Sequence, residues 1–273
     1  MHVVAAVGVT HFTTTLGVIC FVFSHIFFAT FGISLGYHRY FSHRSYKASP
    51  AFEKILAVIS VLCFQGGPIY WAAVHRMHHI KTEKKGDAHS AARGFFWSHF
   101  GWMLYRRPNG FSYSYAQRYI GDLTNKKFLN AVDRNQLAIN FAFLMCLALT
   151  SWVFGRLDLF FWMGPIRIVT VWHSTWLINS FSHGAKLSPG LPHGLRNNVI
   201  IDFLLGGEGW HKSHHERPGI FSHRANWHFD FGNTCLKLMF ILGLAFPNSN
   251  RSKTTEKDLS DEVNSEVVEQ VQP

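Results

Sequence analysis

The feature that most constrains this chain is a run of 21 residues, Leu16 to Gly36, in which His25 is the only side chain that can carry a charge. An α-helix of about 20 apolar residues is long enough to cross the hydrocarbon core of a bilayer. Two further apolar runs, Leu137 to Gly155 and Leu159 to Ile178, contain 19 and 20 residues. The sequence therefore predicts an all-α integral membrane protein with spans near 16–36, 137–155 and 159–178.

The last two predicted spans are separated only by a short segment that contains Arg156 and Asp158. They are predicted to form a transmembrane hairpin, although Arg167 and His173 interrupt the second of them. A pair of buried core helices is the alternative interpretation of two such apolar runs. Composition favours the membrane, because only 15% of the residues are charged, whereas about a quarter are charged in an average soluble chain.

The formal net charge of +10 has two possible explanations, nucleic-acid binding and contact with an anionic membrane surface. The basic residues flank apolar spans instead of covering a soluble fold, which favours membrane lipids as partners and argues against nucleic acid. Residues 37–136 contain fifteen Lys and Arg against five Asp and Glu. The positive-inside rule therefore places this middle segment in the cytoplasm, and the hairpin returns the rest of the chain to the same side.

Three other segments complete the predicted organisation. Ala51 to Trp71 is apolar but is broken by Gly66-Gly67-Pro68, so we expect an interfacial or re-entrant helix. Residues 1–15 are too short to cross a bilayer and lack the basic region and cleavage site of a signal peptide. Residues 248–273 contain six acidic side chains, three basic ones and no aromatic one, which predicts a disordered polar tail.

Histidine is far more frequent than in an average globular chain, with 18 residues in 273. The four cysteines are scattered and form no C-x-x-C pair. This excludes rubredoxin-like, zinc-ribbon and cysteine-ligated iron–sulfur sites within the chain. Neutral imidazole is the commonest side-chain ligand of metals, so the histidines are the candidates for metal binding.

The histidines gather in four motifs next to the apolar runs. His38 and His43 form H-x4-H, residues 75–79 and 211–215 each form H-x2-H-H, and His183 follows the last span. Positions i, i+3 and i+4 share one face of a helix, so each H-x2-H-H motif directs at least two imidazoles to one place. An H-x4-H pair does not share a face of a regular helix, so we expect the chain to bend there.

Together the motifs bring nine imidazoles to the predicted cytoplasmic side: His38, His43, His75, His78, His79, His183, His211, His214 and His215. A zinc site takes about four ligands, so nine are too many for one metal. Two iron ions, each with four or five ligands and an open position for oxygen, fit the count. All-nitrogen donors suit iron, copper, nickel or zinc, and the spacing does not choose among them. The lack of carboxylates argues against a ferritin-like di-iron site.

The other histidines are expected to be hydrogen-bonded, exposed or interfacial: His2, His11, His25, His99, His173, His193, His223 and His228. His89, in the segment Asp87-Ala-His89, is the exception. It is a candidate to lie directly behind a metal ligand and to orient it.

Five segments carry a resemblance to a known family: GYHRYFSHRSYK (36–47), HRMHH (75–79), RGFFWSHFGW (93–102), NSFSHGAK (179–186) and GEGWHKSHHERP (207–218). The sequence resembles the membrane-bound fatty acid desaturases, and within them the Δ9 acyl desaturases of the stearoyl-CoA type. The resemblance runs from about Leu16 to about Pro247 and implies a desaturase domain over residues 1–247. It also implies transmembrane helices capped by a cytosolic helical domain that holds a non-haem di-iron centre.

The resemblance further implies that the nine clustered histidines bind iron and that Asn179 reaches one iron through water. The expected reaction uses O2 and leaves a cis double bond, at Δ9, in a saturated fatty acyl thioester or acyl lipid. Two electrons per turnover come from a separate donor of the ferredoxin or cytochrome b5 type. Gln65, Trp71 and Trp176 are close in sequence to the motifs and are candidates to line the acyl tunnel, although ordinary packing explains the aromatic residues equally well.

The chain departs from this family in three ways. The family usually has four crossings, and residues 1–15 look like the end of a first helix whose beginning is missing. Ala73 and Val74 stand where the animal acyl-CoA enzymes carry an Arg-Asp pair that helps to hold CoA, so acyl carrier protein or a lipid ester are alternatives to CoA. No cytochrome b5-like His-Pro-Gly-Gly segment is present, so the donor is not fused to this chain.

Other classes of protein fit less well. The nearest alternative is a lipid hydroxylase on the same di-iron scaffold, which product analysis would separate from a desaturase. A histidine-rich metal transporter or metal-binding membrane protein should place ionisable residues inside its spans, whereas these motifs lie outside them. A zinc hydrolase needs a general base such as the Glu of H-E-x-x-H, and the sequence contains no such motif.

Overall fold

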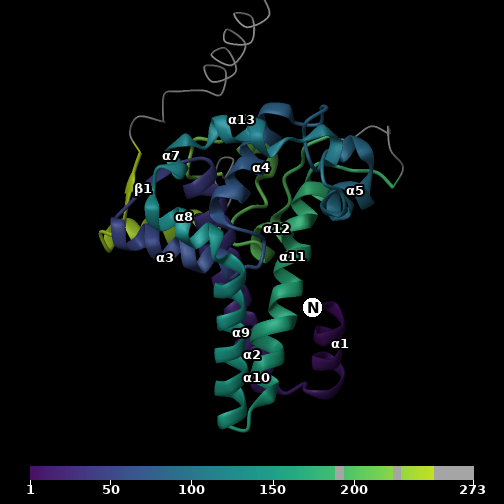
Figure 1. The fold of residues 1–273 in the computed structure, drawn as a ribbon, viewed down its shortest axis with the longest axis vertical. Coiled ribbons are helices and arrows are strands. Elements are labelled where there is room, and N and C mark those ends of the chain that lie inside the picture. Colours follow the sequence, from purple (N-terminus) through teal and green to yellow (C-terminus); the bar gives the residue numbers. More distant parts are fainter. Residues whose placement is uncertain (188–193, 224–228, 249–273) are drawn as a thin grey trace, which may run out of the picture.

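A stalk of long helices carries a broad helical cap (Figure 1). The computed structural model describes residues 1–187, 194–223 and 229–248. In the stalk, α2 (Thr15–Phe27) continues directly into the π-helix η1 (Phe28–Ser42), which enters the cap. The stalk also contains α9 (Gln136–Val153) and one continuous helical run made of α10 (Leu157–Phe161), η6 (Trp162–Ile166), α11 (Arg167–Leu177) and η7 (Ile178–Ser182).

The cap consists of short helices and one two-stranded sheet. Strand β1 (Tyr46–Ala48) pairs antiparallel with β2 (Ala245–Pro247), which ties residues near the C-terminal end of the described chain to the segment after η1. The helices of the cap are α3 (Pro50–Val61), α4 (Pro68–Lys81), η2 (Ala91–Arg93), α5 (Phe95–His99), η3 (Gly101–Leu104), η4 (Pro108–Gly110), α6 (Tyr113–Ala116), η5 (Gln117–Tyr119), α7 (Gly121–Thr124), α8 (Lys127–Arg134), α12 (Val199–Leu204), α13 (His211–Glu216) and α14 (Phe231–Ile241).

The first helix, α1 (His2–His11), lies against the stalk and packs on η6 (Figure 1). The contact is close, because a Cβ on Gly8 would lie 2.8 Å from the Cβ of Phe161. The next helix starts after a short turn, where Thr14 Oγ1 accepts a hydrogen bond from the backbone N–H of Gly17 at 3.0 Å. A threonine at this N-cap position supplies one of the acceptors that the first turn of a helix lacks.

Two helices in the described part of the chain are long and apolar enough to cross a membrane, Thr15–Ser42 and Gln136–Val153. They include the first predicted span and nearly all of the second. The third predicted span, 159–178, is helical throughout, but it is not one of these two helices. The multi-pass topology therefore stays a prediction.

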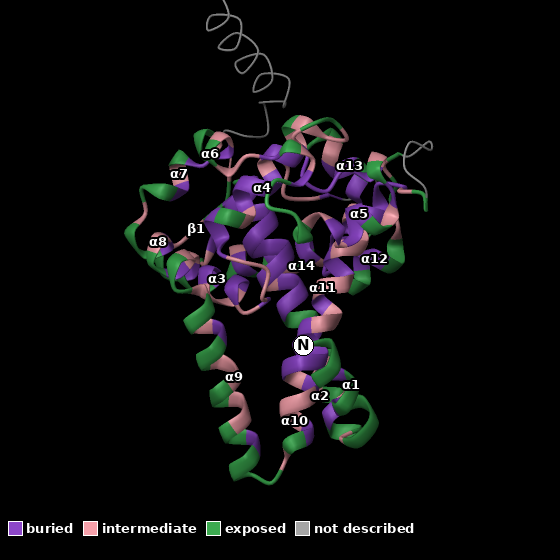
Figure 2. Cartoon of the chain, turned by 45° about the vertical axis from the view of Figure 1, so that its right-hand side comes forward, coloured by how far each residue is buried: buried purple, intermediate pink, exposed green. Residues whose placement is uncertain are grey.

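The helix α9 turns large apolar side chains outward. Phe141, Leu149 and Trp152 are 66%, 59% and 68% exposed, and Figure 2 shows α9 as a largely exposed helix. A buried core helix would cover these side chains, so the alternative of two core helices does not describe α9. An apolar face of this length needs an apolar surrounding such as lipid.

The predicted break at Gly66-Gly67-Pro68 separates α3 from α4. A Cβ on Gly67 would lie 2.0 Å from Asp133 Oδ1. That same carboxylate oxygen accepts the backbone N–H of Ile69, at the start of α4, at 2.8 Å. Glycine is therefore required at this position, because α8 approaches closely enough to cap the helix that carries the second histidine motif.

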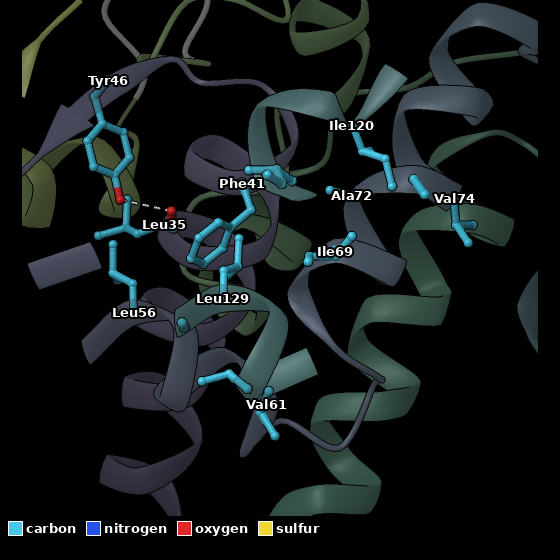
Figure 3. Packing of buried hydrophobic residues seen from close by; sticks show 14 of the residues in the cluster. Leu35, Phe41, Tyr46, Leu56, Val61, Ile69, Ala72, Val74, Ile120 and Leu129 are labelled. Atoms are coloured by element: carbon cyan, nitrogen blue, oxygen red, sulfur yellow. Dashed lines mark hydrogen bonds between the residues drawn. The ribbon is translucent and has the colours of Figure 1, made fainter. Parts of the chain in front are cut away.

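The main hydrophobic core lies in the cap and joins η1, α3, α4 and α8 (Figure 3). Tyr46 Oη donates to the backbone oxygen of Leu35 at 2.9 Å, which fastens β1 to η1. Ala73 and Val74 belong to this core and are 0% and 6% exposed. They pack against other apolar side chains, so at these positions the chain presents no group to a ligand at the surface.

The predicted polar tail, 248–273, falls almost wholly outside the described residues, which end at Asn248. His193 and His228 also lie outside them.

Candidate metal centre

The nine histidines of the four motifs meet inside the cap in two adjoining clusters. In each cluster the candidate ligand atoms all lie within 4.8 Å of one another. The first cluster has five members: His38, His43, His75, His79 and His214. The second has four members: His78, His183, His211 and His215.

In the five-histidine cluster the Nε2 atoms face one another. His38 and His214 lie 3.0 Å apart, His43 and His75 lie 2.8 Å apart, and His79 is 3.1 Å from both His75 and His214. Imidazole nitrogens that converge in this way surround a common point, as the ligands of one metal ion do.

The four-histidine cluster has the same character. His183 Nε2 lies 2.9 Å from His211 Nε2, which is 3.1 Å from His215 Nε2. The two clusters touch, because the rings of His79 and His215 are stacked with their centroids 4.2 Å apart. Two metal ions bound here would be neighbours.

Each H-x2-H-H motif supplies both clusters. In α4, His75 and His79 belong to the first cluster and His78 belongs to the second. In α13 the arrangement is reversed, because His211 and His215 share the second cluster. The i and i+4 positions point in nearly the same direction along a helix, and the i+3 position points to its side. The motif spacing therefore places each helix between the two sites.

The H-x4-H pair reaches one cluster because the helix widens. The backbone N–H of His43 donates to the oxygen of His38, five residues earlier, at 3.1 Å. A π-helix makes these i→i+5 bonds, so residues five apart lie one turn apart. The expected departure from a regular helix is present, as π-helical turns that begin at Phe28.

Burial keeps four of the candidate ligands neutral. His75, His78, His211 and His214 are nearly inaccessible to solvent. Burial, reinforced by neighbouring histidines, holds the pKa of each of these four well below the ordinary value. A neutral imidazole keeps a lone pair for a metal, so this is the protonation state that binding requires.

Three carboxylates lie directly behind the histidines. Nδ1 of His38 is 2.5 Å from Glu208, Nδ1 of His78 is 3.0 Å from Asp87, and Nδ1 of His183 is 2.7 Å from Glu83. At His183 the contact is a hydrogen bond, and a carboxylate that accepts Nδ1–H fixes the ring orientation and leaves Nε2 free to bind a metal. Neither Glu208 nor Glu83 is a candidate from the sequence alone, because the acids and the histidines that they contact are far apart in the chain.

A buried arginine holds one of these carboxylates in place. Arg39 donates to Glu208 at 3.3 Å and to Asp230 at 3.1 Å. It also donates to the backbone oxygen of Gly207 at 2.6 Å. Gly207 has a φ of +108°, and a Cβ there would lie 2.8 Å from Arg39 Nη2. Only glycine fits this turn without displacing the arginine.

Two further histidines adjoin the clusters. The His89 ring lies 4.3 Å from the His78 ring, and its backbone N–H donates to Asp87 at 3.2 Å. His223 is buried, with Nδ1 3.6 Å from Glu208 and its ring 4.4 Å from the His214 ring. The sequence had grouped His223 with the histidines outside the site, whereas the structure places it against the five-histidine cluster.

The other predicted site residues lie nearby. Asn179 is in η7, four residues before His183. The Trp71 indole stacks on His75 with ring centroids 4.9 Å apart, and its Nε1 donates to Gln65 at 3.4 Å. Trp176 packs against a different histidine, His99, with centroids 5.8 Å apart.

The donor set fits metal ions. In the described part of the chain no hydrogen-bond partner faces the buried Nε2 of His78. A buried polar atom without a partner is costly, and a bound cation would satisfy it. Nitrogen-only donors suit iron, copper, nickel or zinc and exclude a magnesium or calcium site.

The fold and the site define a helical protein with apolar stalk helices and two adjoining histidine clusters that could each hold a metal ion. Comparison with known proteins agrees with this description, because the fatty acid desaturase family model matches residues 13–226. The chain belongs to the fatty acid desaturase family and is therefore an oxidoreductase.

Curated relatives include the sn-2 palmitoyl-lipid 9-desaturase of Nostoc sp., which is 38% identical over 232 residues, or 82% of this chain and 78% of the relative. The sn-1 stearoyl-lipid 9-desaturase of Anabaena variabilis is 34% identical over 78% of this chain and 77% of its own length. Acyl-CoA desaturase 3 of Mus musculus is 31% identical over 93% of this chain and 73% of its own length.

Proposed function

We propose that this chain is a membrane Δ9 desaturase that introduces a cis double bond into a saturated acyl chain of a membrane lipid, with O2 and two electrons from a separate donor. The observation that carries the proposal is the division of nine histidines into adjoining clusters of five and four. Two iron ions bound there would supply the activation of dioxygen that oxidation of an unactivated methylene requires. Residues 1–247 act in this proposal as one desaturase domain.

The protein residues hold and orient this centre. The nine histidines are the proposed ligands, and Asn179 is proposed to hold a water at one iron. Glu208, Asp87 and Glu83 fix the rings that they contact. An imidazole would separate each of these carboxylates from a bound metal, so the donor set would contain no carboxylate oxygen.

Gln65, Trp71 and Trp176 are proposed to position the acyl chain and to exclude water. Support comes from the stacking of Trp71 on His75 and from the hydrogen bond of Gln65 Nε2 to Thr175 at 2.9 Å. These contacts join the segment before α4 to α11, next to the five-histidine cluster. Indole rings offer a large, rigid apolar surface against which a methylene chain can pack.

A lipid-linked substrate is favoured over acyl-CoA. Relatives such as the Nostoc protein are named acyl-lipid desaturases, and the packing of Ala73 and Val74 leaves no charged pair at those positions. A phosphate-bearing head group still needs cations. Arg106 and Arg107 line a cavity of about 320 Å³ at the cap together with Tyr70, Trp102 and Tyr113, which supports an anionic head group at this place.

The proposal places the histidine clusters on the cytoplasmic side of a multi-pass membrane protein. Its support is the excess of fifteen basic over five acidic residues in 37–136. The same excess suits an acidic electron donor such as a ferredoxin or cytochrome b5. A hydroxylase on the same scaffold remains the alternative, and only the product separates the two reactions.

The test is expression of the full chain in a host that needs added unsaturated fatty acids, followed by mass spectrometry of its lipids. We expect growth without the supplement and a Δ9 product. His78→Ala is the control that should produce none at equal expression. A hydroxylated product, or no product from a well-expressed, iron-loaded protein, would overturn the proposal.

The head group is tested by competition between stearoyl-CoA, stearoyl-carrier protein and stearoyl-phospholipid, using purified enzyme and a reconstituted donor. We expect the phospholipid to be favoured and the CoA thioester to be accepted less well. An exclusive preference for stearoyl-CoA would reject the lipid substrate and would leave desaturation itself intact.

A further inference from the structure

Two of the nine clustered histidines reach the surface, and each belongs to a different cluster. His79 is the half-buried member of the five-histidine cluster, and His215 is the half-buried member of the four-histidine cluster. The other seven side chains are buried. Each cluster therefore has one imidazole with an accessible edge, and a protein that approaches from outside meets these two rings first.

The two accessible rings form a stacked pair. Their centroids lie 4.2 Å apart and their planes are inclined by 19°. His79 Nε2 lies 3.1 Å from the Nε2 atoms of both His75 and His214. His215 Nε2 lies 3.1 Å from that of His211. The pair is in direct contact with both clusters, so no further residue is needed to connect the surface to either one.

The surroundings of the pair are exposed on both helices that supply it. Ile80, directly after His79 in α4, is 37% exposed. In α13, Lys212 and Glu216 are exposed on either side of His215, and residues three apart, such as Lys212 and His215, are neighbours on a helix surface. The helix α13 lies in the upper part of the cap, away from the stalk (Figure 1, Figure 2). A water-soluble protein can therefore approach the pair without meeting the stalk helices.

The exposed charges next to the pair are mostly basic. Residues 80–85 and 211–217 contain one exposed acidic side chain, Glu216, against four exposed basic ones. We refer to these four as the basic rim: Lys84, Lys85, Lys212 and Arg217. Opposite charges on two proteins steer their encounter and fix their orientation. The basic rim therefore fits a partner with an acidic surface.

The proposed reaction needs such a partner, because it takes two electrons from a separate protein. The rate of electron transfer falls steeply as the distance between donor and acceptor grows. Seven of the proposed ligands are buried, so a donor that docks elsewhere on the cap has protein between itself and the metal centre. Docking over His79 and His215 brings the donor against two proposed ligands, one from each cluster.

We propose that an acidic, water-soluble electron-transfer protein docks on the basic rim and that electrons enter the metal centre through the stacked rings of His79 and His215. Each encounter oxidises the donor by one electron and reduces the metal centre by one, so two encounters supply the reaction. Ile80 offers an apolar contact within the rim, which suits the small interfaces of transient redox complexes. The inference rests on the proposed desaturase function. The competing explanation is a basic charge that is spread over the cap and favours no particular surface.

The first test reverses charge in the basic rim. The double variant Lys212→Glu/Arg217→Glu is compared with the wild type in lipid nanodiscs, with a soluble plant-type ferredoxin of acidic net charge as the donor. At low ionic strength we expect reduction of the iron-loaded protein to slow by roughly tenfold or more. Iron content and the rate of reduction by a small uncharged reductant should stay unchanged. Stopped-flow absorbance measures both rates.

The matched control is Lys127→Glu/Arg134→Glu, which makes the same change of charge at two exposed positions of α8. Asp133 of α8 accepts the backbone N–H of Ile69 at the start of α4, whereas His79 lies near the end of that helix. We expect the control to slow reduction much less than the rim variant. Equal slowing in both would overturn the local surface in favour of a spread charge, and unchanged rates in both would reject electrostatic docking.

A second readout needs neither iron nor turnover. Reduced ferredoxin is paramagnetic, so on binding to the metal-free, histidine-labelled protein it should broaden the NMR signals of His79 and His215 more than those of the buried histidines, and less so in the rim variant. His79→Gln and His215→Gln identify the two signals. Absence of binding to the wild type at low salt, or stronger broadening at any other histidine, would overturn the proposal. Binding and reduction without a desaturated product would count against the desaturase function instead, so the two failures are distinguishable.

Discussion

The Nε2 atoms of His38 and His214 lie 3.0 Å apart although 176 positions separate the two residues in the sequence. His38 belongs to η1, which rises from the stalk, and His214 belongs to α13, which lies in the cap. Their contact joins the first and last histidine motifs, so the five-histidine cluster forms only when these two distant segments pack together. Because both side chains belong to the five-histidine cluster, loss of either one is expected to affect that site.

Purified, anaerobically loaded protein is expected to contain iron near two equivalents per chain. His214→Ala removes a member of the five-histidine cluster and His211→Ala a member of the other, so each should lower the iron content toward one equivalent or less and abolish desaturation. Elemental analysis and product assays measure both effects, with His11→Ala as the unaffected control. Stoichiometric zinc with full activity and no iron would contradict the assignment.

Glu83→Gln is expected to weaken iron binding by about 10- to 100-fold, because the Glu83 carboxylate orients His183 at 2.7 Å. Glutamine preserves the size of the side chain and removes its charge. Competition with a chelator of known affinity measures the change. Glu53→Gln is the matched control, since Glu53 contacts Tyr40 and Lys126 away from the clusters; equal weakening in both variants would mean that orientation of His183 is not the cause.

Arg39→Gln is expected to destabilise the protein by about 3–5 kcal/mol, because it leaves Glu208 and Asp230 buried without their partner. This loss is measured as a lower unfolding midpoint in detergent, determined by size-exclusion chromatography of heated samples. Arg44→Gln removes a half-exposed ion pair with Asp122 and should cost less than about 1 kcal/mol. Similar midpoints for the two variants would refute the argument from burial.

Asp202→Asn is expected to stabilise the protein at neutral and alkaline pH. Burial, together with the nearby Asp230 carboxylate, raises the pKa of Asp202 to about 7 from 3.8. The Asp202 carboxyl ionises near pH 3.8 in the unfolded chain and only near pH 7 in the folded chain. The folded protein with aspartate at this position therefore loses stability as the pH rises through this interval. The gain from asparagine in the unfolding midpoint should grow from about pH 4 to pH 7 and then level off. A gain that is constant across this range would show that the raised pKa is not its origin.

Reduction of the metal centre by an acidic protein donor is expected to slow as ionic strength rises. The segment 37–136 has fifteen basic and five acidic side chains, an excess of ten, and opposite charges accelerate encounter at low salt. Stopped-flow reduction across a salt series measures the effect, and a small uncharged reductant is the control. If the rate with the protein donor does not depend on salt, electrostatic steering is rejected. Membrane topology and contact with anionic lipid would then explain the basic residues by themselves.

Much of the site was visible in the sequence because it depends on local spacing. The i, i+3, i+4 pattern of His75, His78 and His79 already indicated convergent imidazoles, and the structure gathers all nine of the expected histidines. What spacing could not reveal is that each such motif serves both clusters. Asn179 stays a predicted water-mediated ligand, and Gln65, Trp71 and Trp176 stay predicted substrate residues.

The fold shows the same division. Apolar length alone identified the helix that contains 16–36 and the helix Gln136–Val153, which covers nearly all of 137–155, because apolar length is a property of a continuous segment. The widening of η1 at the H-x4-H pair was expected only as a bend, since a π-helix depends on how the surrounding helices pack around it. His223 was assigned outside the site because its burial against His214 involves no sequence pattern.

The sequence by itself determined the apolar helices, the nine imidazoles and the family, since length, composition and motif spacing are properties of neighbouring residues. Only the tertiary structure decided which imidazoles share a site, which carboxylates hold them, and that His79 and His215 are the two that reach the surface. These relationships join residues as many as 176 positions apart, and such contacts arise from the packing of helices against one another. No periodicity within a single segment encodes them.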